Sequence, residues 1–262
     1  MTNLSIKSLL LFLMAALALS LTSCDDDDNG DILGINLDDD GTVFLSSNTT
    51  GTAGVLDIED SPLEIETFNT NGMDADGIFY DEDNGYVYQV DRTNNILVAY
   101  EDVLDDVNDD EGVNIKNRST SNFSNGRGLA VMNDNFIVAQ DASDDNDNSN
   151  KLVVYTATDE AITISKTVTT DINLWGVRAI GDDLIAVKDN SDSLAVYIDF
   201  LSNADGTTVS PDSYIKIDGI VRTHGLAYDA NDDVMVLTDV GDAGSDTDGA
   251  IIMIRNFISV IN

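Results

Sequence analysis

The sequence predicts an all-β protein, for three reasons. One unit of short strands recurs five times, the second strand of each unit is apolar on both faces, and helical periodicity is absent after residue 23. Strands that are apolar on both faces need cover on both sides, and twisted sheets stacked around an axis provide that cover. We therefore predict a β-propeller of about five blades, each a four-stranded antiparallel sheet, with a β-sandwich as the alternative.

Each repeat opens on a glycine that begins a short apolar strand. The five glycines are Gly34, Gly77, Gly128, Gly176 and Gly225. The second strands are predicted at Thr42–Ser46, Tyr86–Val90, Phe136–Gln140, Leu184–Lys188 and Val234–Thr238. An aspartate closes four of these strands (Asp91, Asp141, Asp189 and Asp239), and Ser47 holds the matching place in the first.

A third and a fourth strand complete each predicted unit. The third strands are Val55–Ile58, Leu97–Tyr100, Leu152–Tyr155, Leu194–Tyr197 and Ile251–Ile254. The more polar fourth strands are Glu64–Phe68, Thr163–Val168, Tyr214–Ile217 and Phe257–Ile261. Short strands at even spacing, separated by Asp, Asn and Gly turns, are typical of such repeated meanders.

The segment Gly128–Tyr155 and the turn Asp91-Arg92-Thr93-Asn94-Asn95-Ile96-Leu97-Val98 resemble the repeat of NHL and SMP-30-type propellers. The resemblance covers residues 32–262 and implies the propeller fold. For the SMP-30 branch it also implies a hydrolase or lactonase with a divalent metal held by a glutamate, an asparagine and an aspartate, of which only Asp76 is suitably placed. Such propellers usually have six or more blades, so five repeats leave either a compact ring or a partial copy.

The N-terminal residues predict export and attachment to a membrane. Residues 1–23 contain one charge and an apolar run of signal-peptide length, which is too short to span a bilayer. The segment Leu21-Thr22-Ser23-Cys24 resembles a bacterial lipoprotein cleavage box, which implies a lipid such as palmitate on Cys24 and attachment to a membrane. Residues 24–31 form an acidic tether resembling that of surface-exposed Bacteroidetes lipoproteins, so we expect the outer-membrane surface, with inner-membrane or periplasmic retention as the alternative.

The charge balance limits the partners. With 49 acidic and 12 basic side chains the formal net charge is −37. Phosphate binding requires a basic surface, so nucleic acid is excluded as a partner. The hydrophobic share of 42% supplies enough apolar surface for a folded core.

A candidate ligand site follows from the propeller topology. The loops between blades and the loops between second and third strands share one face, and the residues that precede the repeat glycines lie there. These residues are Leu33, Asp76, Arg127, Trp175 and His224. The last four are predicted to line the channel mouth, as in a propeller ligand site, and a cap in which they only satisfy one another is the alternative.

The same face receives long acidic loops that could hold calcium, because calcium prefers six to eight oxygen ligands. The candidate ligands are Asp141, Asp144, Asp145, Asp147, Asp242, Asp246 and Asp248. Neither loop has the full spacing of a twelve-residue calcium loop, and solvated loops are the alternative.

Catalysis has little support in the sequence, which contains neither a Gly-x-Ser-x-Gly elbow nor a phosphate-binding glycine loop. A single cysteine and a single histidine exclude zinc sites of the Cys/His type. The favoured function is therefore a non-enzymatic, lipid-anchored envelope propeller that binds a protein or a glycan or acts as a scaffold. An SMP-30-like metal-dependent hydrolase is the alternative, and a partial chain without activity of its own is a third possibility.

Overall fold

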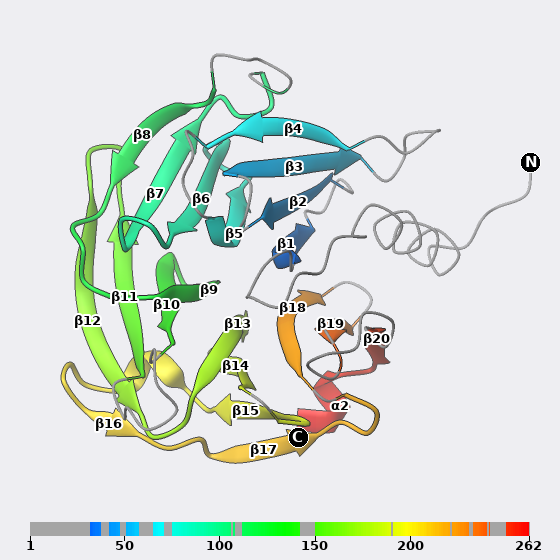
Figure 1. Ribbon diagram of the computed structural model, residues 1–262. Coiled ribbons are helices and arrows are strands. Elements are labelled where there is room, and N and C mark those ends of the chain that lie inside the picture. Colours follow the sequence, from blue (N-terminus) through cyan, green and yellow to red (C-terminus); the bar gives the residue numbers. More distant parts are fainter. Residues whose placement is uncertain are drawn as a thin grey trace, which may run out of the picture.

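The computed structural model describes residues 32–37, 42–47, 51–57, 65–70, 75–105, 107, 112–141, 150–189, 191–220, 222–230, 233–239, 241 and 250–261. These residues form five antiparallel sheets arranged as the blades of a propeller (Figure 1). The strands of each blade follow chain order from the axis outwards, except that the short β16 (Thr208–Val209) leaves blade 4 to pair at the edge of blade 3. The prediction of an all-β propeller with five repeats is confirmed.

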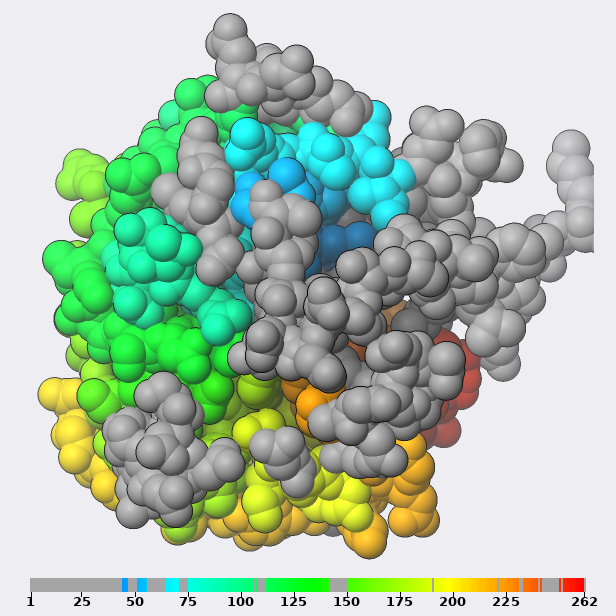
Figure 2. Space-filling view, in the orientation of Figure 1, coloured from blue at the N-terminus to red at the C-terminus, as the bar shows by residue number. Residues whose placement is uncertain are grey.

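The strands divide among the blades in chain order. Blade 1 contains β1 (Ile32–Leu37), β2 (Thr42–Ser47), β3 (Thr52–Asp57) and β4 (Glu66–Asn69). Blade 2 contains β5 (Ala75–Asp81), β6 (Tyr86–Asp91), β7 (Ile96–Glu101) and β8 (Asn114–Arg118). Blade 3 contains β9 (Gly126–Met132), β10 (Asn135–Gln140), β11 (Lys151–Ala157) and β12 (Ile162–Thr170), and the short β16 (Thr208–Val209) pairs in parallel with β12. Figure 2 shows blades 2 and 3 as a continuous surface that runs from teal to green.

Blades 4 and 5 complete the ring. Blade 4 contains β13 (Leu174–Ile180), β14 (Asp183–Lys188), β15 (Ser193–Tyr197) and β17 (Ser213–Lys216), with the 3₁₀ turn η1 (Phe200–Ser202) before its outer strand. Blade 5 contains β18 (Thr223–Asp229), β19 (Val234–Asp239) and β20 (Ala250–Arg255), and the short helix α2 (Ile258–Ile261) follows.

The five inner strands form a closed ring. Each of β5, β9, β13 and β18 contacts the inner strand of the blade before it or after it, and β1 contacts both β5 and β18. Among the described strands, no blade borrows a strand from the opposite end of the chain. The ring of described strands therefore closes through packing of the inner strands, as in the compact ring that was one of the two alternatives.

The repeat glycines make this narrow ring possible. A Cβ atom on Gly77 would lie 2.3 Å from the Leu129 nitrogen, and one on Gly128 would lie 2.6 Å from the Val177 nitrogen. A Cβ on Gly176 would lie 2.4 Å from the His224 carbonyl oxygen. Each glycine thus touches the backbone of the next blade at a distance that no larger residue permits.

Apolar side chains fill the space between neighbouring blades. One cluster joins blades 3 and 4 and contains Ile137 and Leu184, and a second joins blades 4 and 5 and contains Ile185 and Leu237. Successive side chains of a strand point to opposite sides, so the two faces of β14 contribute to these two clusters. β10 contributes its other face to a third cluster, between blades 2 and 3. The prediction that the second strands are apolar on both faces because both are covered is confirmed.

The predicted fourth strand of blade 5, Phe257–Ile261, is wrong. Asn256 adopts a left-handed conformation (φ 53°), which ends the extended chain, and α2 begins two residues later. Phe257 is fully buried in the core between blades 4 and 5, where it anchors this turn. The other three predicted fourth strands agree with β4, β12 and β17 to within two residues.

The predicted N-terminal signal for export and membrane attachment lies outside the described residues, which begin at Ile32. Neither the signal peptide at 1–23 nor the acidic tether that starts at Cys24 is therefore described. Within the described segments, no helix has the length and hydrophobicity needed to cross a bilayer.

Candidate functional site

Every inner strand carries a β-bulge at the residue that precedes its repeat glycine. The pairing register shifts between Ala75 and Ile78 in blade 2, between Leu174 and Val177 in blade 4, and at the corresponding place in the other three blades. A bulge sets two residues opposite one and changes the direction of a side chain. The four predicted site residues therefore lie at bulges, where the direction of a side chain changes.

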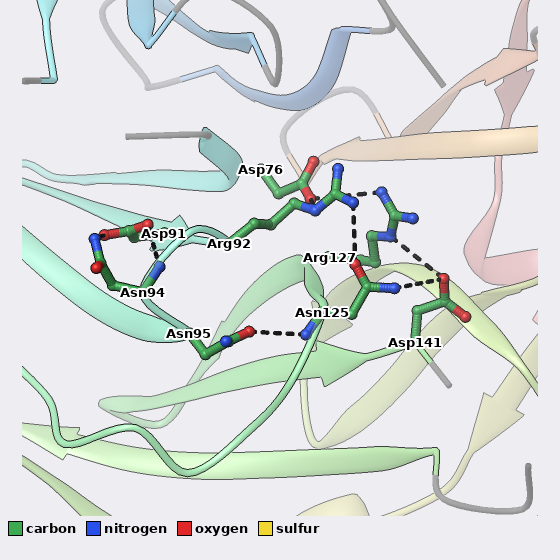
Figure 3. Close-up of polar contacts among 8 residues, drawn as sticks. All are labelled: Asp76, Asp91, Arg92, Asn94, Asn95, Asn125, Arg127 and Asp141. Carbon is green, nitrogen blue, oxygen red and sulfur yellow. Dashed lines mark hydrogen bonds and ion pairs between the residues drawn. The ribbon is translucent and has the colours of Figure 1, made fainter. Parts of the chain in front are cut away.

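Asp76 lies at the centre of an ion-pair network at this mouth (Figure 3). Its side chain is fully buried, and its Oδ2 lies 3.2 Å from Arg92 Nε and 3.8 Å from an Arg127 terminal nitrogen. Arg92 comes from the turn between β6 and β7, whereas Arg127 comes from the bulge of β9. Two cations therefore hold one carboxylate that has no access to water.

Arg127 continues the network into the next blades. Its Nε lies 3.4 Å from Asp141 Oδ2, and the centre of its guanidinium lies 3.8 Å from the centroid of the Trp175 ring. Trp175 in turn stacks on His224, with the ring centroids 4.1 Å apart and an interplanar angle of 7°. A continuous series of contacts thus runs from Asp76 through Arg127 and Trp175 to His224.

The structure brings together all four residues that the sequence placed at the channel mouth. They come from four consecutive blades, and each contacts the next. The fifth residue of the predicted set, Leu33, lies in β1, and its side chain is outside the described part of the structure.

Two residues of the site were not predicted. Arg92 also donates a hydrogen bond of 3.0 Å to the Asn125 Oδ1, and Asn125 donates to Asp141 Oδ2 at 3.3 Å. The sequence held a signal for both, because Arg92 follows the end of a second strand and Asn125 lies two residues before Arg127. Both positions fall on the face that carries the mouth.

The closing aspartates shape the loops around the mouth. Asp91 accepts hydrogen bonds from the backbone nitrogen of Asn94 at 3.0 Å and from its side chain at 2.7 Å. The next residue, Asn95, accepts a 2.8 Å hydrogen bond from the backbone nitrogen of Asn125. This bond connects the turn between β6 and β7 of blade 2 to the residue that precedes β9 of blade 3. These bonds hold Arg92 over Asp76, as Figure 3 shows.

The predicted calcium ligands are described in one position only. Asp141 is buried and contacts Arg127 and Asn125. The remaining candidates, Asp144, Asp145, Asp147, Asp242, Asp246 and Asp248, lie outside the described residues. Within the described part of the chain, no three acidic, histidine or cysteine side chains gather in a metal-binding arrangement.

Burial raises the pKa of Asp141 to about 6, against the opposing effect of Arg127, and the charge of Asp189 adds to the rise. A carboxyl group whose pKa is raised by folding takes up a proton in the folded chain before the unfolded chain does. Its ionisation therefore destabilises the fold above pH 6, and this cost disappears as the pH falls towards 4.

We expect the difference in unfolding free energy between the wild-type protein and Asp141→Asn to depend on pH in that direction. The wild type should gain stability relative to the variant as the pH falls from 7 to 5, because only the wild type takes up this proton. Urea unfolding of both proteins at pH 7, 6 and 5 measures the difference. A difference that stays constant, or that shrinks on acidification, would show that Asp141 is not the titrating group.

The described residues form a closed β-propeller in which polar and aromatic side chains from four blades contact one another. No protein-family model and no curated protein sequence matches the chain. A chain in the crystal structure of a nidogen/laminin complex is similar over 87% of this chain and 77% of its own length, with 14% identity and a TM-score of 0.57. The glutaminyl cyclase of Myxococcus xanthus is similar over 80% of this chain and 86% of its own length, with 14% identity and a TM-score of 0.52. At these identities the likenesses show the propeller fold alone.

Proposed function

We propose that this protein is a non-enzymatic binding propeller of the cell envelope, whose channel mouth binds a protein or glycan ligand. The observation that carries the proposal is the convergence of Asp76, Arg127, Trp175 and His224 from four blades on one face. The propeller neighbours include a chain from a complex and an enzyme, so the fold is compatible with either class of function. The site must therefore decide between them.

The contacts of Asp76 favour binding over metal-dependent hydrolysis. In the SMP-30-like alternative this residue is the one suitably placed metal ligand. Its carboxylate instead lies within 4 Å of two guanidinium groups, those of Arg92 and Arg127. A divalent cation at Asp76 would meet the repulsion of both arginines, so these residues do not fit a catalytic metal.

The proposal includes a lipid anchor at Cys24 and exposure on the outer membrane. It rests on the cleavage box and on the acidic tether that follows it. Metabolic labelling with an alkyne palmitate analogue should mark the wild-type protein and leave Cys24→Ser unmarked. Labelled protein that resists protease added to intact cells would place the anchor on an inner leaflet instead.

The binding function is tested with the mature chain carrying Cys24→Ser, applied to arrays of glycans and of envelope proteins. Trp175 is the only tryptophan, so a ligand bound at the mouth should change the fluorescence of the protein. The outer-strand variant Tyr214→Ala, which alters an exposed side chain of β17, should bind as the wild type does. Ligands that leave the tryptophan emission unchanged, or whose binding is lost with Tyr214→Ala, would place the binding surface elsewhere.

Thermal unfolding separates this proposal from the hydrolase alternative. A ligand that binds only the folded state raises the unfolding midpoint. We expect the same Tm in EDTA and in millimolar calcium at matched ionic strength. A calcium-specific rise of several degrees would instead favour a metal-dependent propeller.

A further inference from the structure

The boundary between blades 4 and 5 differs from its counterparts at the channel mouth. At two described boundaries, the side chain two residues before the bulged residue forms a hydrogen bond with the preceding blade. Between blades 2 and 3, Asn125 accepts a hydrogen bond from Arg92. Between blades 3 and 4, Asn173 accepts a bond of 2.6 Å from Asn150. The equivalent position between blades 4 and 5 holds a longer, charged residue, Arg222.

Three hydrogen-bonding atoms at this boundary have no partner within the described residues. They are Nε of Arg222, Oγ1 of Thr223 and Nε1 of Trp175, and all three atoms are buried. Thr223 as a whole is 1% exposed, whereas the side chains of Trp175 and Arg222 retain some exposure. A buried polar atom without a partner costs free energy, so these atoms indicate a missing acceptor.

The three residues that carry these atoms lie at the same boundary between blades. Trp175 packs against the core between blades 4 and 5, and the next residue, Gly176, touches the backbone of His224. Thr223 and Arg222 immediately precede His224 in the chain. Leu174, at the position equivalent to Thr223, faces the preceding blade, so Thr223 likewise faces blade 4.

The available groups favour an anionic oxygen ligand over a stacked sugar. Both faces of the Trp175 ring are in contact with protein, one with Arg127 and one with His224, so the indole offers its N–H edge. An indole N–H is a donor only, and a guanidinium presents donors in a fork that matches a carboxylate. Thr223 adds a hydroxyl group that can also donate.

One neighbouring acid limits the charge of the ligand. Asp239 is 5% exposed and its Oδ1 accepts a bond of 2.6 Å from the backbone nitrogen of Arg222. The single guanidinium of Arg222 can offset the charge of a monoanionic ligand bound beside the Asp239 carboxylate. A dianionic ligand at the same place would leave an excess of negative charge. The site therefore suits a group of charge −1.

We propose that the boundary between blades 4 and 5 at the channel mouth is a carboxylate-binding subsite formed by Trp175, Arg222 and Thr223. This inference rests on the proposed binding function and deepens it, because it names the chemical group that the mouth recognises. The carboxylate accepts the fork of Arg222 and hydrogen bonds from the indole N–H and the threonine hydroxyl.

The test uses the one tryptophan as its reporter. Sodium acetate and sodium D-glucuronate are titrated into ¹⁵N-labelled mature protein carrying Cys24→Ser, with sodium chloride and glucose as matched additions. The indole N–H resonance should move and reach saturation with both carboxylates and should respond to neither control. A response to glucuronate alone would identify a sugar acid as the source of the group, and an equal response to both would identify the carboxylate itself.

The variants separate binding from folding. Arg222→Ala should weaken carboxylate binding about tenfold or more, because a charge-assisted pair is lost, and Thr223→Val should weaken it several-fold. Arg118→Ala removes an exposed arginine on the outer strand β8 and should bind as the wild type does. If Arg222→Ala does not fold, Arg222→Lys keeps the charge, lacks the fork and should still bind more weakly.

An indole resonance that is unmoved by carboxylates, or that moves equally in wild type and Arg222→Ala, overturns the subsite. An equal response to chloride would show an adventitious ion only and would overturn it as well. These outcomes leave the proposed function standing if an array ligand still changes the fluorescence of Trp175. The reverse result, with carboxylate binding but no glycan or protein ligand, would overturn the proposed ligand class and leave the subsite in place.

Discussion

Replacing Gly128 with alanine should lower the unfolding free energy by about 3 kcal/mol, the upper end of what overpacking a close contact costs. The added Cβ would lie 2.6 Å from the Val177 nitrogen and 2.9 Å from the Gly176 Cα. Both are backbone atoms of blade 4, so no side-chain rotation relieves the contact. The ring would have to open between blades 3 and 4.

Gly54→Ala is the matched control for this prediction. Gly54 also lies within a strand, but its added Cβ would approach the Ile65 Cγ2 atom at 3.0 Å. That atom is at the end of a side chain on the blade's surface, where Ile65 is 46% exposed and free to shift. We expect a change within about 1 kcal/mol, since alanine also suits a strand better than glycine does. Equal losses in urea unfolding of the two variants would contradict the role given to the repeat glycines.

Asp76→Ala should cost about 3–5 kcal/mol of stability, the usual loss when one partner of a buried ion pair is removed. Asp76 has no exposed surface, and Arg127 is only 5% exposed. Without Asp76, the guanidinium of Arg127 keeps Asp141 as its described ionic partner. Burial raises the pKa of Asp141 to about 6, so this partner loses its negative charge as the pH falls below that value. The variant should therefore lose more stability at pH 5 than at pH 7.

Asp192→Ala provides the comparison, because its ion pair with Lys216 lies at the surface. Asp192 is 41% and Lys216 68% exposed, with a separation of 3.0 Å between the charged atoms. Solvent screens an exposed pair of this kind, so its loss should change the stability little, and less still in high salt. Thermal and urea unfolding of both variants measure the contrast. A loss for Asp76→Ala as small as that for Asp192→Ala would show that the network at the mouth does not stabilise the fold.

The repeat and its alternation allowed much of this architecture to be predicted. The glycine spacing identified five blades, and the apolar second strands predicted burial between them. The positions before the glycines grouped Asp76, Arg127, Trp175 and His224, and these side chains contact one another in that order. A regular pattern of strands carries this information because the topology repeats with it.

Local geometry accounts for what the sequence left open. The bulges depend on pairing between strands, so residue spacing alone does not reveal that Arg127 and Trp175 face their neighbours. A short segment with four apolar residues, such as Phe257–Ile261, suits a strand or a short helix equally well, and the left-handed Asn256 produces a turn. Arg92 follows a second strand, and this position indicated its face of the propeller but not its contact with Asp76.

Quenching of the single tryptophan by acrylamide measures whether the Trp175 indole is stacked between Arg127 and His224. Because Arg127 and His224 cover the two faces of Trp175, the indole of the folded wild type should be strongly protected from quenching. His224→Ala should raise the quenching constant several-fold while the protein remains folded, and Tyr214→Ala should not change it. A wild-type quenching constant as high as that of free indole would show that Arg127 and His224 do not cover Trp175. A quenching constant that His224→Ala leaves unchanged would show that His224 does not cover it.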